Sequence, residues 1–303
     1  MVKFKAICRD QNDYQRRTNT EIEKVYRNPN PILHPFQKAK EYVRALNAAK
    51  LERVFAKPFL FSLNDHTDGV KCLAKNFKNL SELASGSFDG QVILWNVNGR
   101  KPIFNINTSH DFVKGLCFSN TGEEFLTCGD DNVINLWRKS SLFEQKEKIF
   151  NESNINIEQN GAMKYKATAV FQTEAFLESI DHSYDERTFA TAGGVVSVWN
   201  YERNIPVQQF KNVADGFIRV KFNHVENHIV LATGYDRSIN IYDLRTNNPL
   251  KSVSMRNKSS AACWNPQEPF NFTVGNEDSN LYTYDMRKLD TVKMIHKDHI
   301  LSV

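Results

Sequence analysis

The stretch SGSFDGQVILWN, Ser85–Asn96, decides the fold, because it joins a turn, an aspartate and a tryptophan at a fixed separation. Asp89 precedes Trp95 by six residues, and the apolar residues between them alternate in a way that predicts a strand buried on both faces. The Phe-Asp-Gly segment is typical of a tight turn. If this arrangement were unique, Asp89 would be a candidate catalytic carboxylate; if it recurs, it is part of the architecture.

The aspartate-to-aromatic spacing recurs along the chain. It is found again in DNVINLW, DRSINIY and DSNLYTY, which end at Trp137, Tyr242 and Tyr284. The segment VVSVWN keeps the aromatic residue at Trp199 but has Gly193 in place of the aspartate. The aromatic residues are separated by 42, 62, 43 and 42 residues. Units of about 40–45 residues with four short strands are typical of WD repeats. The sequence therefore predicts an all-β fold, a WD40 β-propeller with about five blades visible.

Two of the units contain every member of a polar network. The segments DHTDGV and SHDFVKGL upstream resemble the Gly-His or Asp-His start of WD repeats. This resemblance implies a hydrogen-bonded tetrad in each unit, made of His66, Ser85, Asp89 and Trp95 in the first, and His110, Thr127, Asp131 and Trp137 in the second. Such a network stabilises a core only when every member is bonded. Ala232 and Val274 replace the hydroxyl in the fourth and fifth units, so complete tetrads are not expected there.

A set of serine, histidine and aspartate is also the composition of a catalytic triad. The set occurs twice at the repeat spacing, which favours an architectural role. The chain has no Walker loop, no H-E-x-x-H motif and no nucleophile elbow. Its five cysteines lack C-x-x-C spacing, which indicates an intracellular protein with free thiols rather than a zinc site. We therefore predict a non-enzymatic protein without metal, cofactor or small-molecule substrate.

Residues 1–57 do not fit the repeat and form a basic arm. The first 60 residues hold thirteen lysines and arginines against six acidic residues, whereas the remainder is slightly acidic. The proline-rich segment Arg27–Phe36 is expected to be extended. Gln37–Phe55 contains helix formers and no glycine or proline, so a helix is predicted there. No run of about 18 apolar residues is present, so no segment is expected to span a membrane.

The basic side chains of the arm have two interpretations. They either form the solvated face of a helix that leans on the propeller, or they contact phosphates of RNA or of a ribonucleoprotein. No base-reading motif is present, so any RNA contact is expected to depend on shape and charge. The candidate contact residues are Lys38, Lys40, Arg44, Lys50, Arg53 and Lys57.

The propeller, residues 58–303, departs from the repeat in two places. The 62-residue step contains an Asn-rich stretch at about 140–165, expected to be an exposed insertion between blades, after which residues 167–176 resume the propeller as strand. His299 and the apolar residues after it resemble the start of a sixth unit. We therefore expect a ring of seven blades that continues beyond residue 303, with Lys57–Leu63 as the strand that completes its last blade.

Several segments closely resemble the Sof family of WD-repeat proteins. They are NPILHPF, EYVRALNAAKLERVFAKPFL, CWNPQEPFNFTVGNEDSNLYTYDMRKLDT and DHILSV, and the resemblance covers nearly the whole chain except the insertion. It implies a nucleolar scaffold of the small-subunit processome. In that assembly the partners would be processome proteins and the U3 small nucleolar ribonucleoprotein, which support pre-rRNA (18S) processing and 40S assembly. Direct contact with pre-rRNA would be made by the arm.

A second function follows from two short motifs. YDLR (Tyr242–Arg245) and YDMR (Tyr284–Arg287) resemble the WD-x-R boxes by which some propellers dock on the adaptor of cullin-4 ubiquitin ligases. An exposed arginine can bind an acidic partner through two parallel hydrogen bonds. The docking candidates are Asp243, Arg245, Asp285 and Arg287, and the alternative function is that of a substrate receptor. Two other possibilities stay open: salt bridges between neighbouring blades, and a scaffold that binds no RNA.

Overall fold

The computed structural model describes residues 30–57, 59–108, 110–152, 165–211, 215–246, 249–297 and 299–300. The chain divides into two units, of which one contains the N-terminal arm and the other, from Leu63 onward, contains nearly all of the β-structure. No helix within the described residues is long and apolar enough to cross a membrane.

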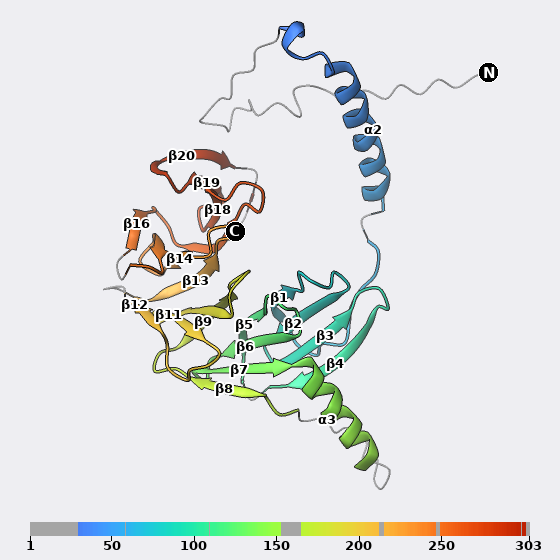
Figure 1. The fold of residues 1–303 in the computed structure, drawn as a ribbon, viewed down its shortest axis with the longest axis vertical. Helices are drawn as coiled ribbons and strands as arrows, with labels where there is room; N and C mark the ends of the chain where they lie inside the picture. The colour runs from blue at the N-terminus through green and yellow to red at the C-terminus, as the bar shows by residue number, and fades with distance from the viewer. Residues whose placement is uncertain are drawn as a thin grey trace, which may run out of the picture. The chain divides into compact units, whose positions relative to one another are not determined.

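The larger unit consists of five four-stranded antiparallel sheets, each a meander in which consecutive strands pair (Figure 1). We call these sheets blades one to five. Blade one contains β1 (Val70–Lys75), β2 (Glu82–Ser87), β3 (Gln91–Asn96) and β4 (Lys101–Asn107). Blade two contains β5 (Val113–Phe118), β6 (Glu124–Gly129), β7 (Val133–Arg138) and β8 (Ala169–Gln172). Blade three contains β9 (Leu177–His182), β10 (Thr188–Gly193), β11 (Val196–Asn200) and β12 (Gln208–Phe210).

The last two described sheets repeat this plan. Blade four contains β13 (Phe217–Phe222), β14 (Ile229–Gly234), β15 (Ser238–Asp243) and β16 (Pro249–Ser254). Blade five contains β17 (Ser259–Trp264), β18 (Asn271–Asn276), β19 (Leu281–Asp285) and β20 (Lys288–His296). The first strands of successive blades contact one another, β1 with β5, β5 with β9, β9 with β13 and β13 with β17. The prediction of an all-β propeller with five visible blades is confirmed.

The hydrophobic core lies between the blades rather than inside any one of them. Four clusters of buried side chains each join two successive blades, because a sheet of this kind buries both of its faces. Strand β3 illustrates the rule: Val92, Ile93, Leu94 and Trp95 are all at most 2% exposed. This is the two-sided burial that the alternation in the sequence predicts.

The turn after each repeat aspartate has the same backbone conformation in four blades. Gly90, Asn132, Arg237 and Ser279 follow those aspartates, and their φ angles are 75°, 55°, 67° and 67°. Glycine and asparagine adopt this left-handed region readily, whereas an arginine or serine there is uncommon. The shared conformation shows that the aspartate belongs to a recurring hairpin.

The insertion differs from the expectation in two respects. It lies inside blade two, between β7 and β8, rather than between blades. Its first part is the helix α3 (Lys139–Glu152), which the sequence analysis does not predict. The helix forms because its first turns pack on blade one: Leu142 is 1% exposed, and the Phe143 ring lies 4.7 Å from that of Phe104. Residues 153–164, the most Asn-rich part, lie outside the described residues.

The arm contains a short 3₁₀ helix, η1 (Pro31–Leu33), and the helix α2 (Gln37–Phe55). The extended conformation expected for the proline-rich segment is therefore wrong at Pro31–Leu33, where Asn30 accepts the backbone hydrogen bond of Leu33 that closes the turn. No strand is assigned among the described residues 59–63, where the closing strand was expected. Residues 1–29 and 301–303 lie outside the described residues.

Candidate functional site

Blade two contains a continuous polar network. His110 lies with Nδ1 2.7 Å from Oδ1 of Asp131 and with Nε2 3.0 Å from Oγ1 of Thr127. The indole N–H of Trp137 donates to the same Thr127 oxygen over 3.1 Å. His110 and Thr127 are at most 3% exposed, so the network ties the loop before β5 to strands β6 and β7 away from water.

Blade one has the same residues with a different pattern of contacts. Ser85 Oγ lies 2.5 Å from His66 Nε2 and accepts the Trp95 indole N–H over 2.7 Å. The Asp89 carboxylate does not continue this chain to His66 among the described hydrogen bonds. It accepts instead from the Thr67 hydroxyl and from the backbone N–H of Gln91. Asp89 thus stabilises its own turn and the neighbouring loop, which differs from the tetrad expected in this blade.

The pKa values of His66 and Asp89 reflect this arrangement. Burial lowers the pKa of His66, and the nearby Asp89 charge offsets only part of that shift. For Asp89, burial acts to raise the pKa, but hydrogen bonds from Thr67, Ser87 and the Gln91 backbone outweigh it and lower the pKa. A neutral histidine and an ionised aspartate that do not bond to each other are not arranged for acid–base catalysis.

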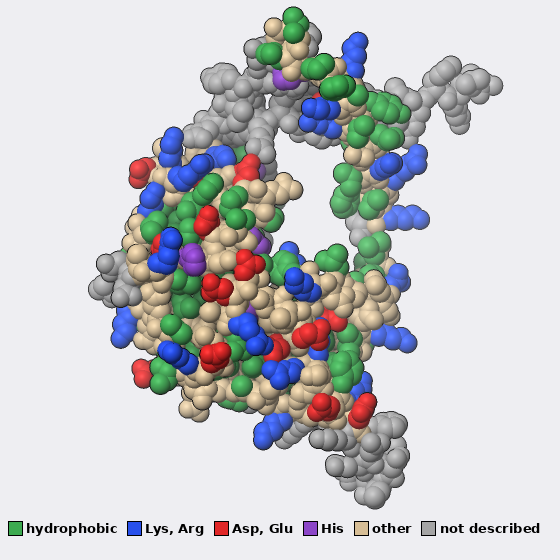
Figure 2. Space-filling view, in the orientation of Figure 1, with side chains coloured by type: hydrophobic (Ala, Val, Ile, Leu, Met, Phe, Trp, Pro, Cys, Tyr) green, Lys and Arg blue, Asp and Glu red, His purple; other side chains and the backbone are tan. Residues whose placement is uncertain are grey.

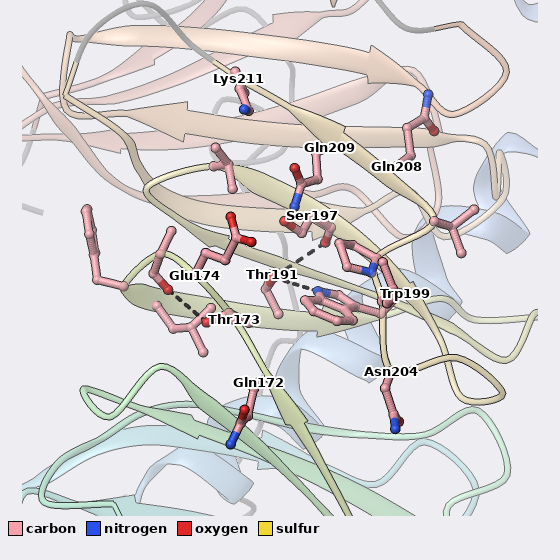
Figure 3. A pocket seen from close by; sticks show the side chains of 17 residues that line it. Gln172, Thr173, Glu174, Thr191, Ser197, Trp199, Asn204, Gln208, Gln209 and Lys211 are labelled. Carbon is pink, nitrogen blue, oxygen red and sulfur yellow. Dashed lines mark hydrogen bonds between the residues drawn. The ribbon is translucent and has the colours of Figure 1, made fainter.

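Blade three lacks the network because its hairpin is shorter. The hydroxyl and the tryptophan that it bonds are eight residues apart in Thr191 and Trp199, against ten in blades one and two. A Cβ at Gly193 would lie 1.7 Å from the carbonyl oxygen of Phe176, so no aspartate fits there. A cavity of about 750 Å³ adjoins this hairpin. Glu174, Gln209 and Lys211 are among the residues that line it. Figure 3 labels them and shows the hydrogen bond between Thr191 and Trp199 near the middle of the view.

Blades four and five use their aspartates locally. Asp236 accepts from the backbone N–H and hydroxyl of Ser238, and Asp278 accepts from the backbone N–H of Asn280. Outside blade two, the repeat aspartates therefore bond within their own turn or the neighbouring loop. Within the described part of the chain, no group of three His, Cys, Asp or Glu side chains could hold a metal ion.

The candidate RNA-contact residues on α2 do not share one face. Successive helix positions rotate by about 100°, so Lys38, Lys40, Arg44, Lys50 and Arg53 are distributed around the helix. Arg44 donates to Glu41 over 2.9 Å at the surface. Lys57 follows the end of the helix and is exposed. Figure 2 shows basic and hydrophobic side chains interspersed along α2.

The apolar side chains of α2 are also unpacked. Ala45 is its only buried residue within the described structure, whereas Tyr42, Val43, Leu51, Val54 and Phe55 are 52–70% exposed. A helix of 19 residues with this composition gains little stability without a tertiary partner. Exposed apolar patches of this kind mark surfaces that bind another molecule.

The two Asp-x-Arg motifs adopt the same geometry at the ends of β15 and β19. Arg245 binds Asp243 with two nitrogens, over 3.0 Å and 2.8 Å, and Arg287 binds Asp285 over 3.0 Å and 2.7 Å. The guanidinium of Arg245 lowers the pKa of Asp243 against the opposing effect of burial. Each pair lies within its own blade, so neither is the salt bridge between neighbouring blades that was the alternative.

Each arginine still presents a free side. The Arg245 and Arg287 side chains are 67% and 62% exposed, and a guanidinium has five N–H groups, of which the aspartate uses those on one edge. Lys251 of β16 connects blade four to the second motif, since its ammonium donates to the backbone oxygens of Met286 and Arg287 over 3.1 Å and 2.7 Å. Lys251 has no signal in the sequence, because its role depends on the packing of blade four against blade five.

Comparison with known proteins agrees with this architecture. The model of the family "WD domain, G-beta repeat" matches residues 57–96 and 100–138. DDB1- and CUL4-associated factor 13 from Xenopus laevis is 40% identical over 302 residues, which is all of this chain and 64% of that protein. Protein SOF1 from Saccharomyces cerevisiae is 38% identical over 315 residues, which cover all of this chain and 63% of that protein. Protein sof1 from Schizosaccharomyces pombe is 41% identical over 280 residues, which cover 92% of this chain and 59% of that protein. The chain thus spans a little under two thirds of the length of these relatives.

Proposed function

Because the chain belongs to the Sof family of WD-repeat proteins, we propose that it is a non-enzymatic scaffold of ribosome biogenesis. In this role it is a nucleolar component of the small-subunit processome. It supports pre-rRNA (18S) processing with the U3 ribonucleoprotein and the assembly of the 40S subunit. Its partners are processome proteins, and pre-rRNA itself contacts the arm.

The exposed surface of α2 is the observation that carries this proposal. Basic and apolar side chains alternate around the helix, and only Ala45 is buried. A helix with charged and apolar groups on all sides is suited to a site where RNA phosphates and protein surround it together. The rigid propeller then presents its rims to further proteins while the arm reaches into the assembly.

The test replaces the basic side chains of the helix. A chain with Lys38, Lys40, Arg44 and Lys50 changed to glutamine should recover less U3 RNA after affinity purification from cells. Its association with RNA should also depend less steeply on salt, by about 0.7 of a unit in the log–log slope for each lost single-strand phosphate contact. The matched control changes Lys101, Arg203, Lys258 and Lys288 of the propeller to glutamine, which removes the same charge and should leave the slope unchanged. Equal U3 recovery by both variants would refute the proposal.

A second function is favoured by the repeated Asp-x-Arg geometry. We propose that Arg245 and Arg287 also form a docking ridge for an acidic surface of a cullin-4 ligase adaptor, with the chain as substrate receptor. Support comes from the two identical bidentate pairs on adjacent blades and from relatives that are named for association with DDB1 and CUL4. Asp243 and Asp285 fix the orientation of the guanidinium groups, which reduces the entropy that binding would cost.

Charge reversal separates the two functions. Arg245→Glu together with Arg287→Glu should abolish capture of the adaptor while recovery of processome proteins is retained. The matched control is Arg203→Glu together with Arg256→Glu, which reverses two other exposed arginines of the propeller. Adaptor capture that survives the first pair, or that is lost with both pairs, would exclude the docking ridge.

A further inference from the structure

The five blades surround a cavity of about 720 Å³, which is separate from α2 and from the Asp-x-Arg motifs. All five blades contribute to its lining, through the last residues of their first strands and the segments that follow. Blade one supplies Lys75, Phe77 and Lys78, blade three supplies Asp181 and Tyr184, and blade four supplies Lys221 and His224. The cavity therefore lies where the first strands converge.

An aromatic cluster forms one wall of this cavity. The Tyr184 ring lies 4.2 Å from the His224 ring and 5.2 Å from the Phe77 ring, with the Phe77 and Tyr184 planes at 73°. These residues come from blades three, four and one. Phe77 is 50% exposed, so part of a large apolar ring is available to a ligand. A half-exposed phenylalanine supported edge-on by a second aromatic ring offers a rigid stacking surface.

The charge of the cavity is positive. Three lysines line it against one aspartate, and that aspartate is already engaged: Asp181 pairs with Lys221 over 2.8 Å and accepts the Phe222 backbone N–H. The Lys75 ammonium lies 5.0 Å from the centre of the Phe77 ring. Burial lowers the pKa of His224; the Asp181 charge opposes this shift, and Lys75 and Lys221 add to it. An anion that entered the cavity would meet the ammonium groups of Lys75 and Lys78 from blade one.

The geometry points to a binding site for a nucleotide of single-stranded RNA, and we propose that its base stacks on Phe77 while Lys75 and Lys78 contact the adjoining phosphates. Single-stranded RNA is bound by aromatic rings that stack on bases and by basic grooves that follow the backbone. A phosphorylated peptide is the competing ligand, but phosphate monoesters on peptides are gripped by arginine forks, and the lining contains no arginine. This inference rests on the proposed function, which supplies the RNA. The residues of the cavity, however, are not those of α2.

The opposite end of β1 provides a matched control. Lys71, at the start of the strand, lies 5.9 Å above the ring of Phe88, so the same pair of residue types occurs there. That pair is next to acidic residues: Asp89 follows Phe88, and Asp68 precedes Gly69, whose carbonyl oxygen accepts the Phe88 backbone N–H. The same chemistry in an acidic setting should not hold an anionic chain.

The test measures binding of an 8-nucleotide single-stranded RNA carrying a fluorophore to the 303-residue chain by anisotropy. Phe77→Ala should weaken binding about 5- to 100-fold, the usual loss for one stacking partner. Lys75→Ala should weaken it as well and reduce the salt slope by about 0.7. Phe88→Ala and Lys71→Ala should leave the affinity within about twofold. RNA containing 4-thiouridine should crosslink to the peptide that contains Phe77 or Tyr184. Melting temperatures confirm that each variant is folded.

Free nucleotide and phosphopeptide complete the design. Adenosine monophosphate should compete at millimolar concentration and inorganic phosphate more weakly, because the base contributes to binding. Three outcomes would each overturn the inference. They are an equal loss of RNA affinity at Phe77 and Lys75 and at Phe88 and Lys71, an unchanged affinity in Phe77→Ala, and binding of a phosphopeptide in place of RNA. The glutamine variants of α2 are measured in parallel: a loss confined to them would leave the proposed function standing and exclude the cavity.

Discussion

The Nδ1 atom of His110 lies 2.7 Å from a carboxylate oxygen of Asp131, whereas the equivalent aspartate of blade one, Asp89, bonds to Thr67. Two sets of the same four residue types therefore form two different networks. The difference lies in the loop before the first strand, where Thr67 of blade one competes for the carboxylate. It allows the energetic role of the aspartate to be measured within one protein.

Asp131→Ala should destabilise the propeller by about 1–3 kcal/mol, because it leaves the Nδ1 atom of the buried His110 without a hydrogen-bond partner. Asp89→Ala should cost less, about 0.5–1 kcal/mol, since its hydrogen bonds are made near the surface. Chemical denaturation followed by tryptophan fluorescence measures both. Asp131→Asn, which keeps an acceptor for His110, is the control, and equal losses for Asp131→Ala and Asp89→Ala would contradict the difference between the networks.

Lys139→Met should destabilise the protein by about 3 kcal/mol. Lys139 begins α3 and pairs with Glu82 of blade one, and their side chains are only 7% and 15% exposed. Removing one partner leaves the other charge buried and unpaired. The double variant with Glu82→Gln should recover most of the loss, because the amide still accepts from Asn76. Arg44→Met, at the exposed ion pair with Glu41, should cost less than about 1 kcal/mol. If the double variant were as unstable as the single one, the ion pair would not be the cause.

Stability should fall as the pH is lowered through about 6.5. Burial lowers the pKa of His66, His182 and His224, and for His182 the Ser183 carbonyl and the Asp181 charge offset this shift only in part. The unfolded chain protonates these rings near pH 6.5, before the folded chain does. It then binds more protons, so the free energy of unfolding decreases until the pH passes below the folded pKa values. Urea denaturation at several pH values measures the slope, and His182→Asn should make it shallower. A slope unchanged in that variant would assign the effect to other groups.

Gly193→Ala should destabilise the protein by at least about 2 kcal/mol. The new methyl group would lie 1.7 Å from the Phe176 carbonyl oxygen, and backbone atoms must move to admit it. Gly99→Ala is the control, because its nearest neighbour, a side-chain nitrogen of Asn96, is 3.4 Å away. Thermal melting of the two variants is sufficient, and a tolerated Gly193→Ala would mean that blade three can adopt the longer hairpin.

The repeat could be predicted because its signals are local. The spacing from Asp89 to Trp95 and the alternation within β3 depend only on strand geometry and turn chemistry, and the spacing recurs in four of the five units. The helix α2 occupies the residues for which a helix is expected, since its composition lacks any breaker.

What could not be predicted depends on contacts between blades. The helix α3 is stabilised by Phe104, a residue of blade one, which no local pattern connects to the insertion. The cavity of the five blades assembles Phe77, Tyr184 and His224 from units that are separated by up to 147 residues. Whether His66 meets Asp89 depends on how one loop closes, and spacing alone does not determine that.

The position of β8 after the insertion has a consequence for biosynthesis. In blade one, the outer strand β4 begins five residues after β3 ends, so the sheet can complete itself almost as soon as it is made. In blade two, about 30 residues separate the end of β7 from the start of β8, which at 5–20 residues per second delays the outer strand by roughly 1.5–6 seconds. During that interval β7 is an edge with unpaired backbone groups. A nascent chain is therefore most exposed to wrong strand pairing between the emergence of β7 and that of β8 from the ribosome.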